Sequence, residues 1–232
     1  MFYSEDISED IFVLSPEESR HCIKVLRHKS GDQITVTDGK GIVKEARITS
    51  DKPNKVGCQT LSIAQVKKEK SFYVHIAISP TKNMDRIEWF VEKSCEMDID
   101  EISFVFTDHS ERKVLKTDRL HKKSVSAMKQ SGGLHLCKIN EPLKLTEFLK
   151  NTTIGHKMIA YVNDENPETI KTYCEPGQNY LILIGPEGDF SPAEVSKCIA
   201  QGFKPVSLGS KVLRTETAGV IACHSFNFMN DF

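Results

Sequence analysis

Two glycine-containing segments in the C-terminal half carry the residue types best suited to holding a ligand. Residues 184–190 (IGPEGDF) follow an apolar, strand-like run, and residues 208–219 (LGSKVLRTETAG) follow a shorter one; both precede a helix signal. In open α/β sheets, ligands bind at the carboxyl ends of the strands. Glycine and proline there permit close backbone approach and a fixed turn. Each loop alone is explained as a tight connection, but the two together favour a shared pocket.

The start of the helix after the second loop is crowded with polar and ionisable side chains, from Arg214 to Thr217. Glu216 is favoured there by the helix dipole, and Thr215 has the residue type of an N-cap. Capping alone therefore accounts for these residues. A role in chemistry depends on whether the fold brings them to the other glycine-containing loop.

The elements that position these loops alternate between strand and helix patterns from residue 72 onward. Strands are expected at 72–79, 101–106, 158–162, 180–185 and 205–208. Helices are expected at 83–97, 118–130, 145–150, 192–202 and 217–228, the fourth opened by a capping box at Ser191. Such alternation predicts a mostly parallel sheet covered by helices on both faces.

The first seventy residues predict a small β-barrel-like module instead. Strands are expected at 33–37, 42–49 and 56–66, the first two joined by a glycine-containing turn. One helix is expected at 17–28, behind a capping box at Ser15, with core contacts at Cys22, Val25 and Leu26. The charged run at 67–70 is the candidate boundary, although a solvated strand end would have the same composition.

Composition and missing motifs exclude several classes of protein. The net charge of −1 excludes a histone-like polybasic binder. No G-x-G-x-x-G or Walker A sequence occurs, which argues against a Rossmann dinucleotide enzyme and a P-loop NTPase. The seven cysteines form no CxxC pair, so we expect reduced thiols and no metal site. The apolar runs are strand-sized and the N-terminus is acidic, so a cytoplasmic protein without membrane association is expected.

Charge is unevenly distributed along this nearly neutral chain. Residues 112–129 contain seven Lys or Arg and one acid, and a second basic stretch spans residues 20–29. In the predicted helix, Arg20, Lys24 and Arg27 fall on one face. Each cluster could be an ordinary solvated face, but two in different modules favour nucleic-acid binding. Ser110, beside His109, lies outside any nucleophile-elbow motif, so we interpret its loop as binding substrate or ordering the site.

The two C-terminal motifs resemble those of the RsmE family, which methylate N3 of one uridine in 16S rRNA. The resemblance rests on LIGPEG at 183–188 and on LG-x3-LRTETA at 208–218, and it covers essentially the whole chain. It implies an α/β SPOUT-type sheet with a C-terminal trefoil knot at 71–232. A PUA-like RNA-binding β-barrel domain is implied at 1–70, including His21-x-x-Lys24-Val25-Leu26-Arg27. Gly219 departs from the family, which often has a larger residue there.

The resemblance also implies S-adenosyl-L-methionine as cofactor, 16S rRNA in the small ribosomal subunit as substrate, and a homodimer. The residues it implies for cofactor binding are Tyr161, Val162, Ile184, Gly185, Pro186, Glu187, Gly188, Ser207, Leu208, Gly209, Val212, Leu213, Arg214, Glu216, Thr217 and Ala218. Those for RNA binding are Arg20, Lys24, Arg27, Ser110, Arg112, Arg119, Lys122 and Lys123.

The candidate catalytic residues are Arg214, Glu216 and Glu187. The imide proton of uridine N3 must leave before methyl transfer, so the reaction needs a proton acceptor or a group that stabilises the anion. Arg214 suits the developing anion or a phosphate. Glu216 or Glu187 suits the proton or the amino group of the cofactor. A cofactor-free RNA-binding or ribosome-assembly factor is the alternative function, whereas a hydrolase is disfavoured because no nucleophile elbow is present.

Overall fold

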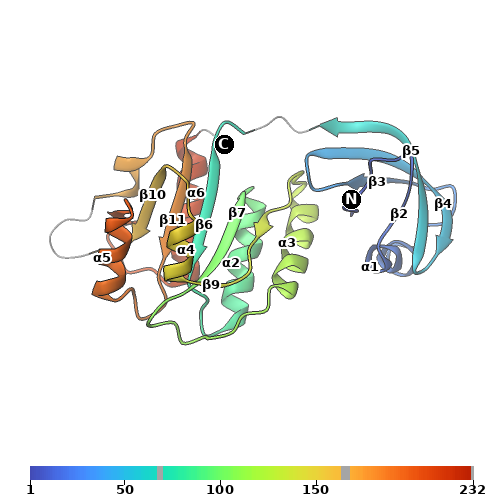
Figure 1. Ribbon diagram of the computed structural model, residues 1–232. Helices are drawn as coiled ribbons and strands as arrows, with labels where there is room; N and C mark the ends of the chain where they lie inside the picture. Colours follow the sequence, from blue (N-terminus) through green and yellow to red (C-terminus); the bar gives the residue numbers. More distant parts are fainter. Residues whose placement is uncertain (67–69, 163–167, 231–232) are drawn as a thin grey trace. The chain divides into compact units, whose positions relative to one another are not determined.

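A computed structural model describes residues 1–66, 70–162 and 168–230 in two compact units. The first unit combines Met1–Glu69 with Val125–Leu136, and the second combines Lys70–Ser124 with Cys137–Phe232 (Figure 1). Residues 125–136 lie in the part of the chain assigned from the sequence to the second domain, yet they pack with the first unit. There the amide of Leu136 donates to Gly39 O at 2.7 Å, and the amide of Gly41 donates to Leu134 O at 2.9 Å.

The first unit is built on a five-stranded sheet in the order β1-β3-β4-β5-β2. Its strands are β1 (Phe2–Tyr3), β2 (Ile11–Val13), β3 (Gln33–Thr37), β4 (Ile42–Lys52) and β5 (Lys55–Val66). The long antiparallel pair β4–β5 is interrupted by register shifts, which bend and twist the strands. Buried side chains such as Val36 and Ile48 form a core of their own under this sheet.

The helix of the first unit is shorter than predicted. Ser15 caps α1 (Pro16–Arg20) by accepting the amide of Glu18, as the capping box predicted. The chain then forms a π-helical turn, η1 (His21–Val25), and Arg27 adopts a φ of 60°. A helix cannot continue through a left-handed residue, so the predicted extension to His28 is wrong. Cys22 is buried as expected, whereas the predicted core contacts Val25 and Leu26 are 63% and 50% exposed.

The second unit contains the predicted parallel sheet, in the order β12-β10-β11-β6-β7-β8, with β9 paired to β7. Its strands are β6 (Tyr73–Ile78), β7 (Glu101–Phe106), β8 (Lys138–Ile139), β9 (Leu143–Lys144), β10 (His156–Ala160), β11 (Asn179–Ile184) and β12 (Lys204–Val206). All these pairs are parallel. Strand β11 lies between β6 and β10, which precede it in the chain, so its carboxyl end is flanked by both.

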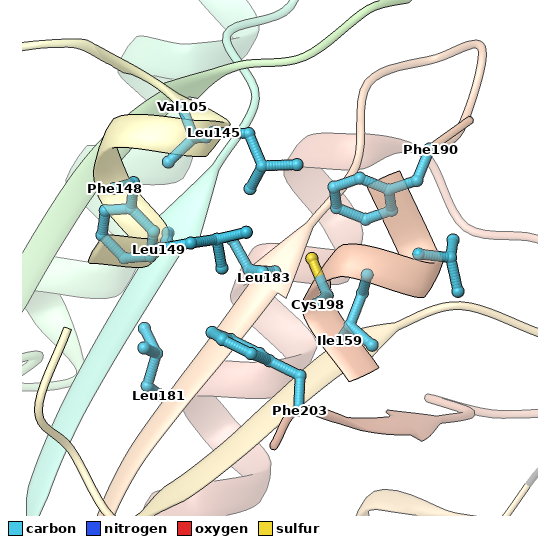
Figure 2. Packing of buried hydrophobic residues seen from close by; sticks show 12 residues of the cluster. Val105, Leu145, Phe148, Leu149, Ile159, Leu181, Leu183, Phe190, Cys198 and Phe203 are labelled. Atoms are coloured by element: carbon cyan, nitrogen blue, oxygen red, sulfur yellow. The ribbon is translucent and has the colours of Figure 1, made fainter. Parts of the chain in front are cut away.

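Helices cover both faces of this sheet, as the continuously apolar β11 requires, since its residues from Tyr180 to Ile184 are all buried. The helices of this unit are α2 (Met84–Glu96), α4 (Leu145–Asn151), the 3₁₀ turn η2 (Ile170–Tyr173), α5 (Pro192–Ala200) and α6 (Thr215–Met229). Helix α3 (Asp118–Ser131) begins in this unit, and its residues from Val125 onward belong to the first unit. Leu181 and Leu183 face a cluster that includes residues of α4 and α5 (Figure 2). On the other face, Tyr180 stacks on Phe226 of α6, with 4.7 Å between ring centroids.

Gly219 allows α6 to pack closely on α2. A Cβ atom at this position would lie 2.5 Å from Cε2 of Phe90, whose ring is fully buried. Glycine is ordinarily unfavourable inside a helix, by roughly 0.5–1 kcal/mol relative to alanine. Here the steric conflict with a buried ring outweighs that preference, which explains a glycine inside this helix.

We therefore expect Gly219→Ala to lower the free energy of unfolding by about 1–3 kcal/mol, as overpacking does in a close-packed core. Gly155→Ala is the matched control, because a Cβ at Gly155 meets no atom within 4 Å. Urea denaturation measures both. The double variant Gly219→Ala/Phe90→Leu removes the ring that the new methyl group would meet. Its loss of unfolding free energy should therefore be smaller than the sum of the losses of the two single variants. Strict additivity would contradict the steric explanation.

A buried polar network joins the amino-terminal ends of β6 and β7. His75 Nε2 lies 2.8 Å from Ser103 Oγ, and its Nδ1 lies 3.8 Å from Glu101 Oε2. Glu101 in turn accepts hydrogen bonds from the Tyr73 hydroxyl at 2.7 Å and from Lys138 Nζ at 2.9 Å. Burial, which disfavours the charged ring, lowers the pKa of His75 to about 4.

This pKa predicts a loss of stability in mild acid. In the unfolded chain His75 has a pKa of about 6.5 and is protonated below that pH, whereas in the folded protein it stays neutral down to about pH 4. Between these two pH values the unfolded state binds one more proton, so acid favours unfolding. Between pH 7 and 4.5, the wild-type free energy of unfolding should therefore fall by about 2 kcal/mol more than that of His75→Gln. Chemical denaturation at each pH measures the difference. Parallel curves for the two proteins would show that His75 is not the titrating group.

Candidate cofactor cavity

A cavity of about 490 Å³ lies at the carboxyl ends of β10, β11 and β12. Three segments line it: residues 160–162 after β10, residues 184–189 except Gly188 after β11, and residues 206–215 after β12, with Ala218 of α6. The two glycine-containing loops thus meet in one pocket, as their positions after strands in the same half of a parallel sheet predicted.

The loop after β11 is held by the side chain of Phe190, which is 4% exposed and belongs to the cluster beneath α5 (Figure 2). Gly185 leaves room for that ring, because a Cβ at Gly185 would lie 3.0 Å from Phe190 Cε2. Asp189 completes the turn with a φ of 59°, a left-handed conformation that asparagine and aspartate tolerate better than other non-glycine residues. The buried phenylalanine therefore determines where the preceding loop residues point.

His109, in the loop after β7, holds the same turn from outside the cavity. Its Nδ1 lies 2.9 Å from Gly188 O and 3.0 Å from Asp189 O. Carbonyl oxygens only accept hydrogen bonds, so Nδ1 carries the proton, and in the neutral ring Nε2 is then the acceptor. A Cβ at Gly188 would lie 3.2 Å from His109 Cβ, so glycine allows this close approach.

The loop after β12 is tied both to itself and to the loop after β11. Ser207 Oγ donates to Gly209 O at 2.8 Å and accepts the Gly209 amide at 3.2 Å. The hydroxyl of Thr215, which is buried, donates to Gly185 O at 3.0 Å. Arg214 is the N-cap residue of α6, so the N-cap role considered for Thr215 is wrong. The hydroxyl of Thr215 instead joins the loop after β12 to the loop after β11.

Comparison with known proteins decides the family. Residues 68–227, which include every cavity residue, match the family model of an RNA methyltransferase domain, and residues 14–59 match an RNA methyltransferase PUA domain. Full-length relatives bear the name ribosomal RNA small subunit methyltransferase E. The chain belongs to the RsmE family of RNA methyltransferases. The second match shows that the RsmE-family chain has a PUA-like region within its first compact unit.

Relatives of this RsmE-family chain align over nearly its full length. A probable rRNA-methyltransferase from Porphyromonas gingivalis is 37% identical, with a TM-score of 0.90 over 99% of this chain and 98% of that one. Ribosomal RNA small subunit methyltransferase E from Neisseria gonorrhoeae, solved bound to S-adenosyl methionine, is 26% identical, with a TM-score of 0.86 over 100% and 98%. The enzyme of the same name from Buchnera aphidicola (strain APS) is 28% identical over 236 residues, 99% of this chain and 92% of that protein.

Most residues expected to bind the cofactor line the cavity. These are Tyr161, Val162, Ile184, Gly185, Pro186, Glu187, Ser207, Leu208, Gly209, Val212, Leu213, Arg214 and Ala218. Gly188, Glu216 and Thr217 do not line it. Six further lining residues were not among those expected: Ala160, Asp189, Val206, Ser210, Lys211 and Thr215. Ala160 and Val206 end strands β10 and β12, and the other four lie inside the two glycine-containing segments. Their position along the chain was therefore available from the sequence, but the direction of each side chain was not.

Glu216, one of the candidate catalytic residues, lies outside the cavity lining and beside Arg86 of α2. Its side chain is 9% exposed in the first turn of α6, where Oε1 lies 3.7 Å from Arg86 Nε of α2. Oε2 is buried without a hydrogen-bond partner among the described residues. A carboxylate in this position contributes to the α2–α6 packing region and does not reach the cavity lining.

The basic residues expected to bind RNA differ in their exposure and in the hydrogen bonds and ion pairs that they make within the protein. In the first unit, Arg20 Nε donates to Asn54 Oδ1 at 3.1 Å, while Lys24 and Arg27 are exposed. The shortened helix and the left-handed Arg27 remove the regular helical face on which these three were placed.

In the second unit, two acids of α2 pair with the basic residues of α3. Arg119 Nε lies 2.7 Å from Glu88 Oε1, and Lys123 Nζ lies 2.9 Å from Glu92 Oε2. Lys122 is exposed. The stretch is therefore less positive in the folded protein than along the sequence.

The loop after β7 is ordered by its own polar residues. Ser110 is 2% exposed, and its Oγ accepts the amide of Thr107 at 2.8 Å. Arg112 donates to Thr81 O at 3.1 Å and to Lys82 O at 2.6 Å. Both residues thus support the loop, which fits the ordering role that was one of the two expectations for Ser110.

The described residues contain no group of three or more His, Cys, Asp or Glu side chains placed to hold a metal ion. None of the described helices combines the length and the apolar composition needed to cross a membrane. The seven cysteines are free and buried.

The hydroxyl that joins the two loops provides a direct test of this geometry. Thr215→Val keeps the side-chain shape but leaves the buried Gly185 carbonyl without its donor, which should lower the free energy of unfolding by about 1–3 kcal/mol. Thr215→Ser is the control, because it retains the hydroxyl. Equal stability of the valine variant and the wild type in chemical denaturation would show that the bond does not hold the loops.

Proposed function

We propose that this chain transfers the methyl group of S-adenosyl-L-methionine to N3 of a specific uridine in 16S rRNA, in the assembled small ribosomal subunit. The observation that carries the proposal is the cavity formed by the two motif loops within the RNA methyltransferase match. The Neisseria relative, whose fold covers the whole of this chain, is bound to the same cofactor.

The cavity fits that cofactor in chemical character. Main-chain groups of the loops after β10, β11 and β12 suit the uncharged edge of an adenine, which needs hydrogen bonds and no counter-charge. Both signs of charge are also present, because Glu187, Asp189, Lys211 and Arg214 line the same space. The amino-acid part of the cofactor carries a carboxylate and an ammonium group, and it therefore finds complementary side chains here.

The chain's own residues must deal with the imide proton of the uridine. When bound, the cofactor supplies a methyl group on a positively charged sulfur. Arg214, exposed at the N-cap of α6 and lining the cavity, would stabilise the anion that develops on the base. Glu187 would accept the proton, since Glu216 lies outside the lining and Glu187 lies within it. Its Oε1 lies 3.4 Å from the Lys82 amide, which orients the carboxylate.

RNA docking is assigned to two regions that we propose act on the same substrate. Residues 1–70 form the PUA-like RNA-binding domain, with exposed Lys24 and Arg27 and with Arg20 as phosphate contacts. In the catalytic domain, 71–232, Arg119, Lys122 and Lys123 of α3 would provide further positive charge. Ser110 and Arg112 would act by ordering the loop after β7.

We propose that the catalytic domain carries the trefoil knot of the SPOUT superfamily and works as a homodimer in the cytoplasm. Support for the knot comes from the strand order, in which β11 lies between β6 and β10. Further support comes from the hydrogen bond of Thr215 to Gly185 O, because it brings the segment after β12 against the loop after β11. Support for a dimer comes from α6, where Phe228 is 71% exposed and Ile221 is 36% exposed.

The test is methyl incorporation into small subunits that lack the modification. Arg214→Ala should lower the rate by about 10²-fold or more, because it removes a donor to the developing anion, while its thermal unfolding stays that of the wild type. Lys197→Ala removes a positive charge from the exposed face of α5, outside the cavity, and should leave the rate unchanged. Full activity of Arg214→Ala would remove Arg214 from the mechanism. Absence of incorporation by the wild type, together with no binding of S-adenosyl-L-methionine, would favour a cofactor-free RNA-binding factor.

A further inference from the structure

Asp189 is an aspartate at a backbone position where glycine is the least strained residue. Its φ of 59° lies in the left-handed region, and its neighbours fix that conformation. Phe190 is anchored in the core on one side, and His109 holds the carbonyls of Gly188 and Asp189 on the other. Because Asp189 lines the cavity, the turn presents a carboxylate to the space where the proposed cofactor would sit.

One oxygen of this carboxylate is used within the turn, and the other is available. Oδ1 accepts the amide of Phe190 at 2.7 Å, which orients the group. Oδ2 has no hydrogen bond within the described part of the chain. Burial raises the pKa of Asp189 above its ordinary value, although the Phe190 amide and the nearby His109 act in the opposite direction. A partly desolvated carboxylate of this kind gains from a cation placed beside it.

The other charged side chains of the cavity do not supply that cation within the protein. Lys211 and Arg214 line the same space, but neither lies within ion-pair distance of Asp189 in the described structure. A methyl donor of the sulfonium type brings two positive centres, the sulfur and the α-ammonium group.

We propose that the Asp189 carboxylate binds a cationic centre of the cofactor. This side-chain contact would add to the main-chain contacts that the two glycine-containing loops make with the same cofactor. The inference rests on the proposed function, since it assigns a residue to the cofactor of that function. Glu187 keeps its separate role toward the proton of the base.

Isothermal titration calorimetry of the full chain tests this with two variants. Asp189→Asn tolerates the left-handed backbone and can still accept the Phe190 amide, but it lacks the charge. Asp189→Gly relieves the backbone and removes the side chain. Both should bind S-adenosyl-L-methionine about tenfold or more weakly than the wild type, the loss expected for one charge-assisted contact. Glu175→Gln, an equal change of charge outside the cavity lining, should bind as the wild type does.

Two analogues identify which cation is bound. S-adenosylhomocysteine lacks the sulfonium charge, and 5′-methylthioadenosine lacks the whole amino-acid end. If Asp189 faces the sulfonium, the variants lose affinity for S-adenosyl-L-methionine alone. If it faces the ammonium group, they lose affinity for S-adenosyl-L-methionine and S-adenosylhomocysteine but keep it for 5′-methylthioadenosine.

Wild-type affinity for S-adenosyl-L-methionine in both folded variants would overturn the inference and leave the proposed function intact, because Asp189 would then be only a turn residue. Loss of 5′-methylthioadenosine binding to the same extent as the other two ligands would also overturn it, since that ligand carries neither cation. A wild-type protein that binds none of the three would overturn the proposed function itself.

Discussion

The buried hydrogen bond from the Thr215 hydroxyl to the Gly185 carbonyl is the constraint on which the proposed site depends. Two loops that end different strands, β11 and β12, must stay adjacent to enclose a cavity. Because the donor lies in the first turn of α6, the position of that helix and the shape of the cavity are coupled. The close approach of Gly219 to Phe90 extends the same coupling to α2.

The cavity is consequently built from core packing more than from flexible loops. Phe190 is part of the apolar cluster under α5 (Figure 2). Residues 184–187 and Asp189, which precede it in the same loop, line the cavity. Ser207 holds the other loop through two bonds to Gly209. Sites whose supporting residues are locked by packing and hydrogen bonds are preorganised for their ligand.

Much of the fold and of the cavity could be predicted because periodicity and strand-to-helix loops are local signals. The parallel sheet, its helices and the meeting of the two loops follow from them. The end of the first helix could not be predicted in this way, since Arg27 adopts a conformation that its residue type does not announce. Side-chain direction was equally hidden: Glu216 faces Arg86, whereas Asp189 faces the cavity.

The ion pairs of the basic residues were also hidden in the sequence. The basic stretch at 112–129 is a strong feature of the sequence, yet Glu88 and Glu92 of α2 pair with two of its members. Those pairings connect residues about thirty positions apart, so no local pattern reveals them. A nearly neutral protein with some of its basic residues already paired is suited to selecting one site on a folded ribosomal particle, because general attraction to phosphate is weak.

The central claim is that this cavity serves methylation of one uridine at N3. The most direct measurement is mass-spectrometric mapping of 16S rRNA from unmodified small subunits incubated with the full chain and S-adenosyl-L-methionine. The account predicts one added methyl group, on N3 of a single uridine, formed more efficiently on assembled subunits than on free RNA. Methylation of another atom or another base, or no methylation by a protein that binds the cofactor, would contradict it.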